Sequence, residues 1–174
     1  MREEELKRAI RDVPDFPKKG ILFKDLTTAF KDPEILKFIA ESIYETYKDA
    51  RITKVVGIES RGFIAGSIVA NMLGAGFVLA RKPGKLPADT YKQTYQLEYG
   101  EDSIEIHKDA IAPDDVVLLH DDLLATGGTA NAAVELIRKA GARNIFINFI
   151  VELTFLEGRD KLGNDTPITC LVQF

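Results

Sequence analysis

Apolar residues along this chain recur at helical spacing in some segments and form short unbroken runs in others. Helical spacing predicts four helices, at residues 3–13, 33–47, 62–73 and 132–140. Asp32 before Pro33 is typical of a helix start, because aspartate caps the free amides and proline suits the first turn. Pro14 is expected to end the first helix, and glycines follow the last two.

Short apolar runs between these helices predict strands. Such runs predict strands at residues 55–58 and 77–80, and strands of the buried kind at residues 116–119, 145–151 and 168–172. Residues 95–99 and 103–107 alternate at period two around Gly100, which predicts an antiparallel hairpin. Two segments show neither helical nor strand periodicity in their apolar residues. We expect residues 15–28 to form a partly exposed flap and residues 81–90 to form a mobile loop.

The alternation of strands and helices predicts an α/β fold in one domain, residues 1–174. Short connections of this kind favour a mostly parallel, twisted sheet flanked by helices on both faces. Ligands of such sheets bind beyond the carboxyl ends of the strands. Chemistry is therefore expected in the segments that follow each strand.

Composition narrows the class of protein. Of the 174 residues, 45% are hydrophobic and 29% charged, which is ordinary for a globular domain and argues against disorder. One cysteine and two distant histidines leave no zinc-ligand spacing and no intrachain disulfide. A charged start and the lack of a long apolar run predict a cytoplasmic protein without a membrane span. A net charge of −4 predicts no general attraction to nucleic acid.

Residues 121–129, DDLLATGGT, carry the clearest candidate chemistry. They join a predicted buried strand to a predicted helix, and the Gly-Gly pair leaves backbone amides free to approach an anion at the helix start. Asp121 and Asp122 would repel a phosphate, but they suit vicinal ribose hydroxyls or a divalent metal ion. Acids followed by a phosphate cradle therefore suggest a ribose 5-phosphate bound end to end.

This motif, in the form VVLLHDDLLATGGT, resembles the phosphoribosyl diphosphate motif of the type I phosphoribosyltransferases, and of the adenine phosphoribosyltransferases in particular. Further segments resemble that family in the same order: DFPKKGILFKDLT, GIESRGF, RKPGKLP, LEYGEDSIEIHKDAI and VELTFLEGR. The likeness runs from about residue 12 to the end of the chain. It implies the type I phosphoribosyltransferase fold, with a small N-terminal hood over the purine site (1–30), a core (31–174) and a flexible β-hairpin loop.

The resemblance also implies a reaction of purine salvage. Adenine and 5-phospho-α-D-ribose 1-diphosphate would give AMP and diphosphate, with Mg²⁺ as the cofactor, in a cytoplasmic homodimer that binds neither nucleic acid nor membrane. Magnesium is expected to bind together with the substrate, with Asp121 and Asp122 as its candidate protein ligands.

The resemblance assigns roles residue by residue. For the 5-phosphate it implies Ala125, Thr126, Gly127, Gly128 and Thr129, and for the ribose hydroxyls Asp121 and Asp122. For the diphosphate it implies Glu59, Ser60, Arg61, Arg81, Lys82 and Lys85, the first loop often containing a cis peptide in similar enzymes. Arginine suits an oxyanion because its donors form a fork, and the loop with Arg81 and Lys82 would close to exclude water.

Adenine recognition is assigned to Leu22, Phe23 and Lys24 of the hood, where many relatives carry arginine in place of Lys24. Glu98 matches the glutamate near the purine N7 and N9 edge and is the candidate for managing the proton there. Tyr99 matches a neighbouring tyrosine.

His120 stands where relatives carry an aliphatic residue, and is expected to be partly buried with its hydrogen bonds satisfied. His107 receives no role, and Cys170 is expected to be inert core.

Two other functions stay open at this point. Transferases of 6-oxopurines commonly place a lysine just after the motif region, whereas this chain has the adenine-type flap and LEYG segment. A regulator that keeps the phosphoribosyl site would add a DNA-binding segment. The first 13 residues are too few for a helix-turn-helix.

Overall fold

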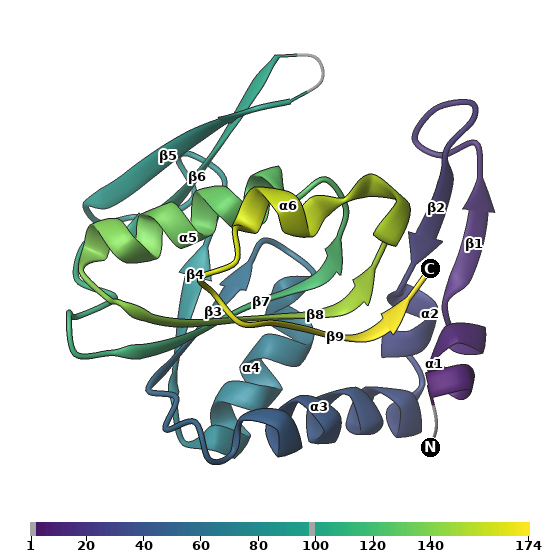
Figure 1. Ribbon diagram of the computed structural model, residues 1–174, viewed down its shortest axis with the longest axis horizontal. Helices are drawn as coiled ribbons and strands as arrows, with labels where there is room; N and C mark the ends of the chain where they lie inside the picture. The colour runs from purple at the N-terminus through teal and green to yellow at the C-terminus, as the bar shows by residue number, and fades with distance from the viewer. Residues whose placement is uncertain (1–2, 98–99) are drawn as a thin grey trace.

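A central sheet of five parallel strands organises the computed structural model, which describes residues 3–97 and 100–174 (Figure 1). The strand order is β4-β3-β7-β8-β9. The strands are β3 (Lys54–Ile58), β4 (Gly76–Ala80), β7 (Val116–Leu124), β8 (Asn144–Glu152) and β9 (Ile168–Gln173). All four neighbouring pairs are parallel. The five predicted strands and the parallel sheet are confirmed, but the edge strand β9, expected to be buried, is only partly so, with Val172 as its one buried residue.

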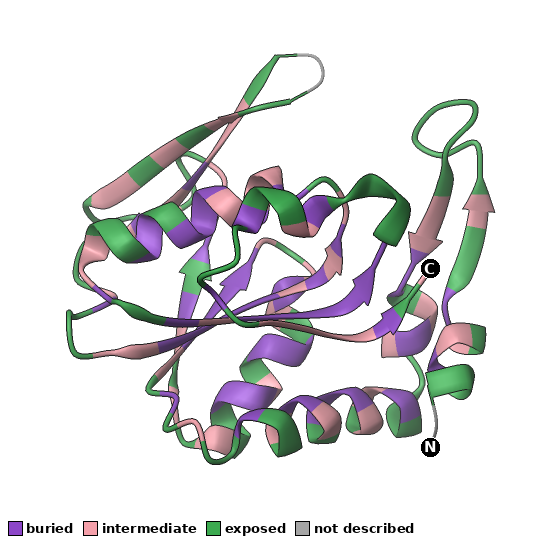
Figure 2. Ribbon diagram, in the orientation of Figure 1, coloured by how far each residue is buried: buried purple, intermediate pink, exposed green. Residues whose placement is uncertain are grey.

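Helices cover both faces of this sheet, as predicted. One face carries α3 (Pro33–Tyr47) and α4 (Gly62–Leu73), and the other carries α5 (Gly128–Ala140) and the short α6 (Gly158–Leu162) (Figure 1). Buried side chains accordingly form two clusters, one on each side of the sheet (Figure 2). Asp32 caps α3 by accepting hydrogen bonds from the amides of Glu34 (3.0 Å) and Ile35 (3.3 Å), a contribution of about 1 kcal/mol.

The N-terminal region corrects the expectation of one helix over residues 3–13. The helix α1 (Glu3–Ala9) ends early, and β1 (Arg11–Pro14) pairs antiparallel with β2 (Leu22–Asp25), so that Val13 lies opposite Phe23. A short helix α2 (Thr27–Phe30) follows. The segment expected to be an irregular flap therefore contains a strand, because pairing with β1 supplies the hydrogen bonds that its own sequence does not predict.

A second hairpin projects from the sheet on the side of α5 (Figure 1). It consists of β5 (Thr90–Gln96) and β6 (Glu101–His107). The predicted hairpin is confirmed, but its first strand runs from Thr90 to Gln96 instead of over residues 95–99, of which 98–99 lie outside the described residues. The loop before it follows β4, and the mobility expected for residues 81–90 stays a prediction.

Two differences from the predicted elements lie next to the candidate motif. Strand β7 continues through Leu124, so Asp121 and Asp122 lie in the strand and not in the loop after it. The 3₁₀ turn η1 (Thr154–Leu156) and helix α6 were not predicted. The loops after β3, β7 and β8 meet at the carboxyl edge of the sheet, where ligands of such folds bind. Within the described residues, no helix is long and apolar enough to cross a bilayer.

Candidate active site

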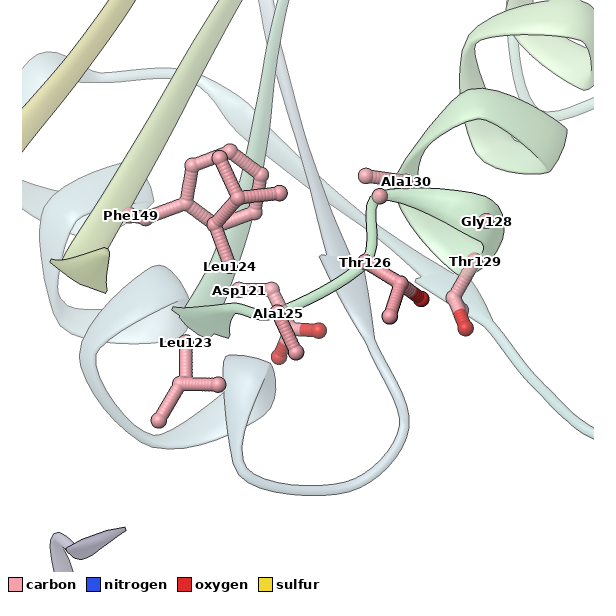
Figure 3. A pocket seen from close by; sticks show the side chains of 10 residues that line it. Asp121, Leu123, Leu124, Ala125, Thr126, Gly128, Thr129, Ala130 and Phe149 are labelled. Atoms are coloured by element: carbon pink, nitrogen blue, oxygen red, sulfur yellow. The ribbon is translucent and has the colours of Figure 1, made fainter. Parts of the chain in front are cut away.

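The loop between β7 and α5 forms a small pocket of about 90 Å³. Figure 3 shows the side chains around it, which come from Asp121, Leu123, Leu124, Ala125, Thr126, Gly128, Thr129, Ala130 and Phe149. Typical small-molecule sites are roughly 300–1,000 Å³, so this pocket suits one compact group of a ligand. Gly127 is the N-cap of α5 and has no side chain to cap it, which leaves first-turn amides for an anion.

Close backbone packing explains a glycine in this loop. Gly127 has φ +82°, and a Cβ there would lie 2.3 Å from the carbonyl oxygen of Gly158. A Cβ on Gly158 would in turn lie 2.3 Å from the carbonyl oxygen of Ala125. The start of α6 therefore packs directly against the loop, with no room for a side chain between the two backbones.

The two acids at the end of β7 have different environments. Asp122 is buried, and its carboxylate accepts a hydrogen bond from the Nε of Arg61. Asp121 accepts a hydrogen bond from the backbone amide of Asp122 (2.8 Å) and lines the pocket. Loss of hydration, followed by the negative charge of Asp122, raises the pKa of Asp121 well above 3.8. A cationic or hydrogen-bond-donating ligand next to Asp121 would stabilise its charged form.

The loop after β3 brings Arg61 to these acids. The Glu59–Ser60 peptide is cis, as the resemblance implies, and Arg61 is the N-cap residue of α4. A Cβ on Gly62 would lie 2.8 Å from the carbonyl oxygen of His120. The glycine therefore lets α4 begin against β7, which sets Arg61 beside Asp122.

Glu59 orients the basic residues that follow β4. Its carboxylate accepts hydrogen bonds from Nε (3.2 Å) and Nη2 (3.1 Å) of Arg81 and from the backbone amide of Lys82 (2.9 Å). These contacts, with the Arg81 hydrogen bond first, lower the pKa of Glu59. Lys85 turns back towards Arg81, whose Nη1 lies 3.5 Å from the Lys85 carbonyl oxygen. A carboxylate held in this way positions the cations that it binds.

The side chain of Lys82 joins a chain of polar contacts that ends at the pocket. Its ammonium group pairs with Asp102 of β6. The Tyr95 hydroxyl donates to the same carboxylate (3.2 Å) and accepts from the hydroxyl of Thr129 (3.0 Å). The hairpin thus links the basic loop to the first turn of α5.

The hood reaches the same site through Phe23. The ring of Phe23 packs edge-on against Phe16, with centroids 5.1 Å apart, and the guanidinium carbon of Arg61 lies 5.5 Å from the Phe23 ring centroid. Leu22 is half exposed. The ammonium group of Lys24 pairs with Asp12 (2.6 Å) and lies 4.0 Å from the Phe174 ring centroid. Arg61 therefore stands between the hood aromatic and the acids of β7.

The structure brings together most of the residues that the sequence singled out. Arg61, Asp122 and Phe23 are in contact, and Glu59 joins the loop after β3 to Arg81 and Lys82. Ser60 is exposed beside them. Glu98 and Tyr99 lie outside the described residues.

His120 corrects the expectation of a partly buried, satisfied histidine. It is 1% exposed, and its Nδ1 donates to Oδ1 of Asn148 (2.9 Å), whose amide nitrogen donates to Thr169. The Nε2 atom has no hydrogen-bond partner among the described residues. Burial lowers the pKa of His120 to about 4. The imidazole is thus neutral at physiological pH and carries one unsatisfied acceptor.

Sequence reasoning missed Tyr95, Asp102 and Gly158. Tyr95 and Asp102 belong to alternating strands in which outward polar residues are ordinary, so nothing local marks them. Gly158 follows a strand by several residues, and only its contact with Gly127 reveals a role.

Comparisons with known proteins agree with this geometry. The phosphoribosyl transferase domain model matches residues 27–161. An adenine phosphoribosyltransferase of Phocaeicola vulgatus is 59% identical over 172 residues, 99% of each chain. The crystal structure of adenine phosphoribosyltransferase from Rhodothermus marinus superimposes with a TM-score of 0.94 at 52% identity, covering 99% of this chain and 98% of that one.

The enzyme from Giardia lamblia, solved in complex with 9-deazaadenine, superimposes with a TM-score of 0.95 at 49% identity and covers 100% of this chain and 98% of its own. Phosphate loop, paired acids, basic loop and hood thus occur in a chain that matches these enzymes over nearly its whole length. The chain belongs to the phosphoribosyltransferase domain family and, within it, to the adenine phosphoribosyltransferases.

Proposed function

We propose that this protein transfers the 5-phosphoribosyl group from 5-phospho-α-D-ribose 1-diphosphate to N9 of adenine, with release of AMP and diphosphate. The observation that carries the proposal is the contact chain Phe23–Arg61–Asp122. It joins the hood to the strand that ends in the phosphate loop. A base beneath the hood and a ribose 5-phosphate on the loop would then meet at the anomeric carbon.

The donor is held first by its 5-phosphate. Backbone amides of Ala125 to Thr129 and the hydroxyls of Thr126 and Thr129 are the proposed donors, and the helix dipole of α5 favours the anion. Asp121 and Asp122 are proposed to accept hydrogen bonds from the ribose hydroxyls. Those bonds favour a charged carboxylate, so ribose binding would lower the raised pKa of Asp121.

The diphosphate is proposed to meet the loop after β3 and the basic loop after β4. Ser60 and Arg61 supply donors on one side, and Arg81, Lys82 and Lys85 supply positive charge on the other, with Glu59 holding Arg81 in place. Charge placed where the leaving group develops its own charge lowers the barrier to its departure.

Magnesium fits this site as an ion shared with the substrate. The described residues contain no group of three acidic, histidine or cysteine side chains able to hold a metal. Mg²⁺, however, commonly binds one or two carboxylates together with substrate phosphates. Asp121 and Asp122 are the proposed protein ligands, reached directly or through water. The ion neutralises the diphosphate when bound.

Adenine is proposed to stack on Phe23 beneath the hood, residues 1–30, with Leu22 beside it and the backbone of Lys24 reading its edge. Since only the backbone of Lys24 is proposed to contact adenine, the replacement of arginine by lysine at this position is mild. The ammonium group of Lys24 pairs with Asp12 instead. The C1–O bond to diphosphate breaks, the C1–N9 bond forms, and Glu98 is proposed to receive the N9 proton.

The remaining assignments are proposals about the whole protein. Residues 31–174 would form the core of a single domain. The protein is proposed to work in the cytoplasm, since its only cysteine, Cys170, offers no intrachain disulfide. The homodimer is proposed from the resemblance to similar enzymes.

The test offers adenine, hypoxanthine, guanine and xanthine separately, each with the phosphoribosyl donor and Mg²⁺, and measures each nucleotide. AMP from adenine alone, lost on chelation of the metal, is the expected result. Product from an oxopurine would overturn the assignment of residues 22–24. Tight donor binding without product would favour a regulator.

The role of Glu98 is tested by comparing the variants Glu98→Ala and Glu101→Ala. Glu98→Ala should lower kcat far more than it weakens donor binding, whereas Glu101→Ala, which removes an exposed carboxylate, should leave both near the wild-type values. Equal kcat in Glu98→Ala and wild type would remove Glu98 from the mechanism.

A further inference from the structure

A buried carboxylate lies behind the phosphate loop, outside the proposed catalytic set. Glu152, the last residue of β8, is 4% exposed. Arg159 donates to both of its oxygens, from Nε (2.6 Å) and Nη2 (2.8 Å), and Gln173 (2.9 Å) and the thiol of Cys170 (3.3 Å) donate as well. Four donors satisfy the acceptor capacity of an ionised carboxylate. The Glu152 charge is therefore fully compensated inside the protein.

Arg159 fastens the start of α6 to the sheet. Besides its fork on Glu152, its Nη1 donates to the carbonyl of Ile168 on β9 (3.1 Å). A planar guanidinium with bonds in two directions fixes its own position more tightly than a single contact does. The residue just before it, Gly158, is held by the same anchor.

Gly158, next to the Glu152–Arg159 ion pair, packs against the phosphate loop. Its backbone lies so close to Gly127 and Ala125 that a Cβ on Gly127 or Gly158 would come within 2.3 Å of a carbonyl oxygen. The amide of Leu153 also donates to the carbonyl of Leu124 (3.0 Å), so the segment after β8 runs along the loop from its beginning. A shift of Gly158 would therefore shift or release Gly127.

We infer that Glu152 and Arg159 are positioning residues for the 5-phosphate subsite. Their ion pair holds the Gly158 peptide against Gly127 and thereby fixes the direction of the amides at the start of α5. The inference rests on the proposed function of the loop as the phosphate cradle. Backbone donors bind an oxyanion well only when they are held in place beforehand, and a misplacement of about 1 Å costs on the order of 100-fold.

The test replaces Arg159 by Met, which keeps an unbranched apolar stem, and by Lys, which keeps the charge without the fork. Ribose 5-phosphate is titrated into each variant by calorimetry, and KM values are measured for the donor and for adenine. Arg138→Met is the matched control, because it removes an arginine from the last turn of α5, far from the loop, where Arg138 pairs with Glu135 and lies 3.5 Å from the hydroxyl of Thr166.

Arg159→Met is expected to weaken ribose 5-phosphate binding and raise the donor KM by about tenfold to a hundredfold. The KM for adenine should stay within about twofold. Arg159→Lys should lie between Met and wild type, and Arg138→Met should match wild type. If Arg159→Met does not fold, the double variant Glu152→Gln/Arg159→Met, which leaves no unpaired buried charge, takes its place.

Unchanged ribose 5-phosphate affinity in the folded variant would overturn the inference, as would equal losses of affinity for adenine and donor, which indicate general loosening. The same titration with Gly127→Ala separates this from failure of the proposed function. If Gly127→Ala also binds ribose 5-phosphate like wild type, the loop is not the phosphate cradle. If only the Arg159 variants bind normally, the cradle stands and the positioning role is wrong.

Discussion

Two neighbouring acidic residues in this site differ in the ion pairs and hydrogen bonds that they form. Asp121 and Asp122 are neighbours in β7, yet Asp122 is paired with Arg61 whereas Asp121 lines the pocket formed by the loop before α5. Successive side chains of a strand point to opposite sides, so adjacent acids meet different partners. Arg61 thus forms an ion pair with Asp122, whereas it acts on Asp121 through its charge alone, which lowers the pKa of that carboxyl against the larger effects of burial and of Asp122.

Gly127→Ala is expected to damage both stability and donor binding. The positive φ alone costs a non-glycine residue roughly 1–3 kcal/mol, and the new methyl group would also meet the Gly158 carbonyl. Gly74→Ala is the control, because Gly74 has φ +66° with nothing within 4 Å of the added Cβ. Urea unfolding should show a loss in both variants, larger for Gly127→Ala, whereas only Gly127→Ala should raise the donor KM. A donor KM that stays at the wild-type value would count against this loop as the 5-phosphate site.

At the scale of elements, one ion pair joins the β5–β6 hairpin to the basic loop that follows β4. Asp102 holds the ammonium group of Lys82, which the proposed mechanism needs at the diphosphate. Asp102→Asn removes this competitor and one negative charge, so the donor KM should fall roughly twofold to fivefold, the worth of a partly exposed ion pair. The effect should shrink as salt is raised. Asp109→Asn, an exposed acid beyond the hairpin, should leave the donor KM unchanged. A rise in donor KM for Asp102→Asn would mean that Asp102 supports Lys82 in the bound state as well.

Elements whose signals are local could be predicted, and those that depend on distant partners could not. Helix α3 follows from the Asp32 cap and its apolar face, and the central strands from unbroken apolar runs. Strand β1 was mistaken for helix because Val13 continues a helical spacing, while its pairing with Phe23 lies outside any local window. Helix α6 is short and is held by Arg159, a contact that no sequence pattern signals.

The same distinction applies to the candidate site. The phosphate loop is one contiguous motif, so its residues were found together. Arg61 and Asp122 could be assigned to the site but not paired, because their contact depends on how α4 begins against β7. Asp102 could be assigned to the site only once the register of the hairpin was known, because that register places it opposite Tyr95.

At the scale of the whole molecule, the sheet separates two buried clusters, and the polar groups between them are few. His120, Asn148 and Glu152 lie on the two central strands, whereas Asp25 anchors the hood through Arg11. The Arg159 pair lowers the pKa of Glu152 to about 2, and the Arg11 pair does the same for Asp25. Carboxylates of this kind stabilise the fold above the unfolded-state pKa of about 4, and the stabilisation is lost as pH falls towards 2.

As pH falls, His120 should begin to destabilise the protein at a higher pH than Glu152 and Asp25 do. Its folded-state pKa is about 4 and its ordinary value 6.5, so between these two pH values the unfolded chain binds the proton and the folded chain does not. The free energy of unfolding should therefore drop by about 1.4 kcal/mol per pH unit as pH falls through this window. His120→Asn keeps a donor towards Asn148 without titrating, so urea unfolding of this variant should lack this drop. Asp121 has a raised pKa and binds its proton in the folded chain first, so it should instead add stability as pH falls. An unaltered slope in His120→Asn would show that the buried imidazole does not control acid stability.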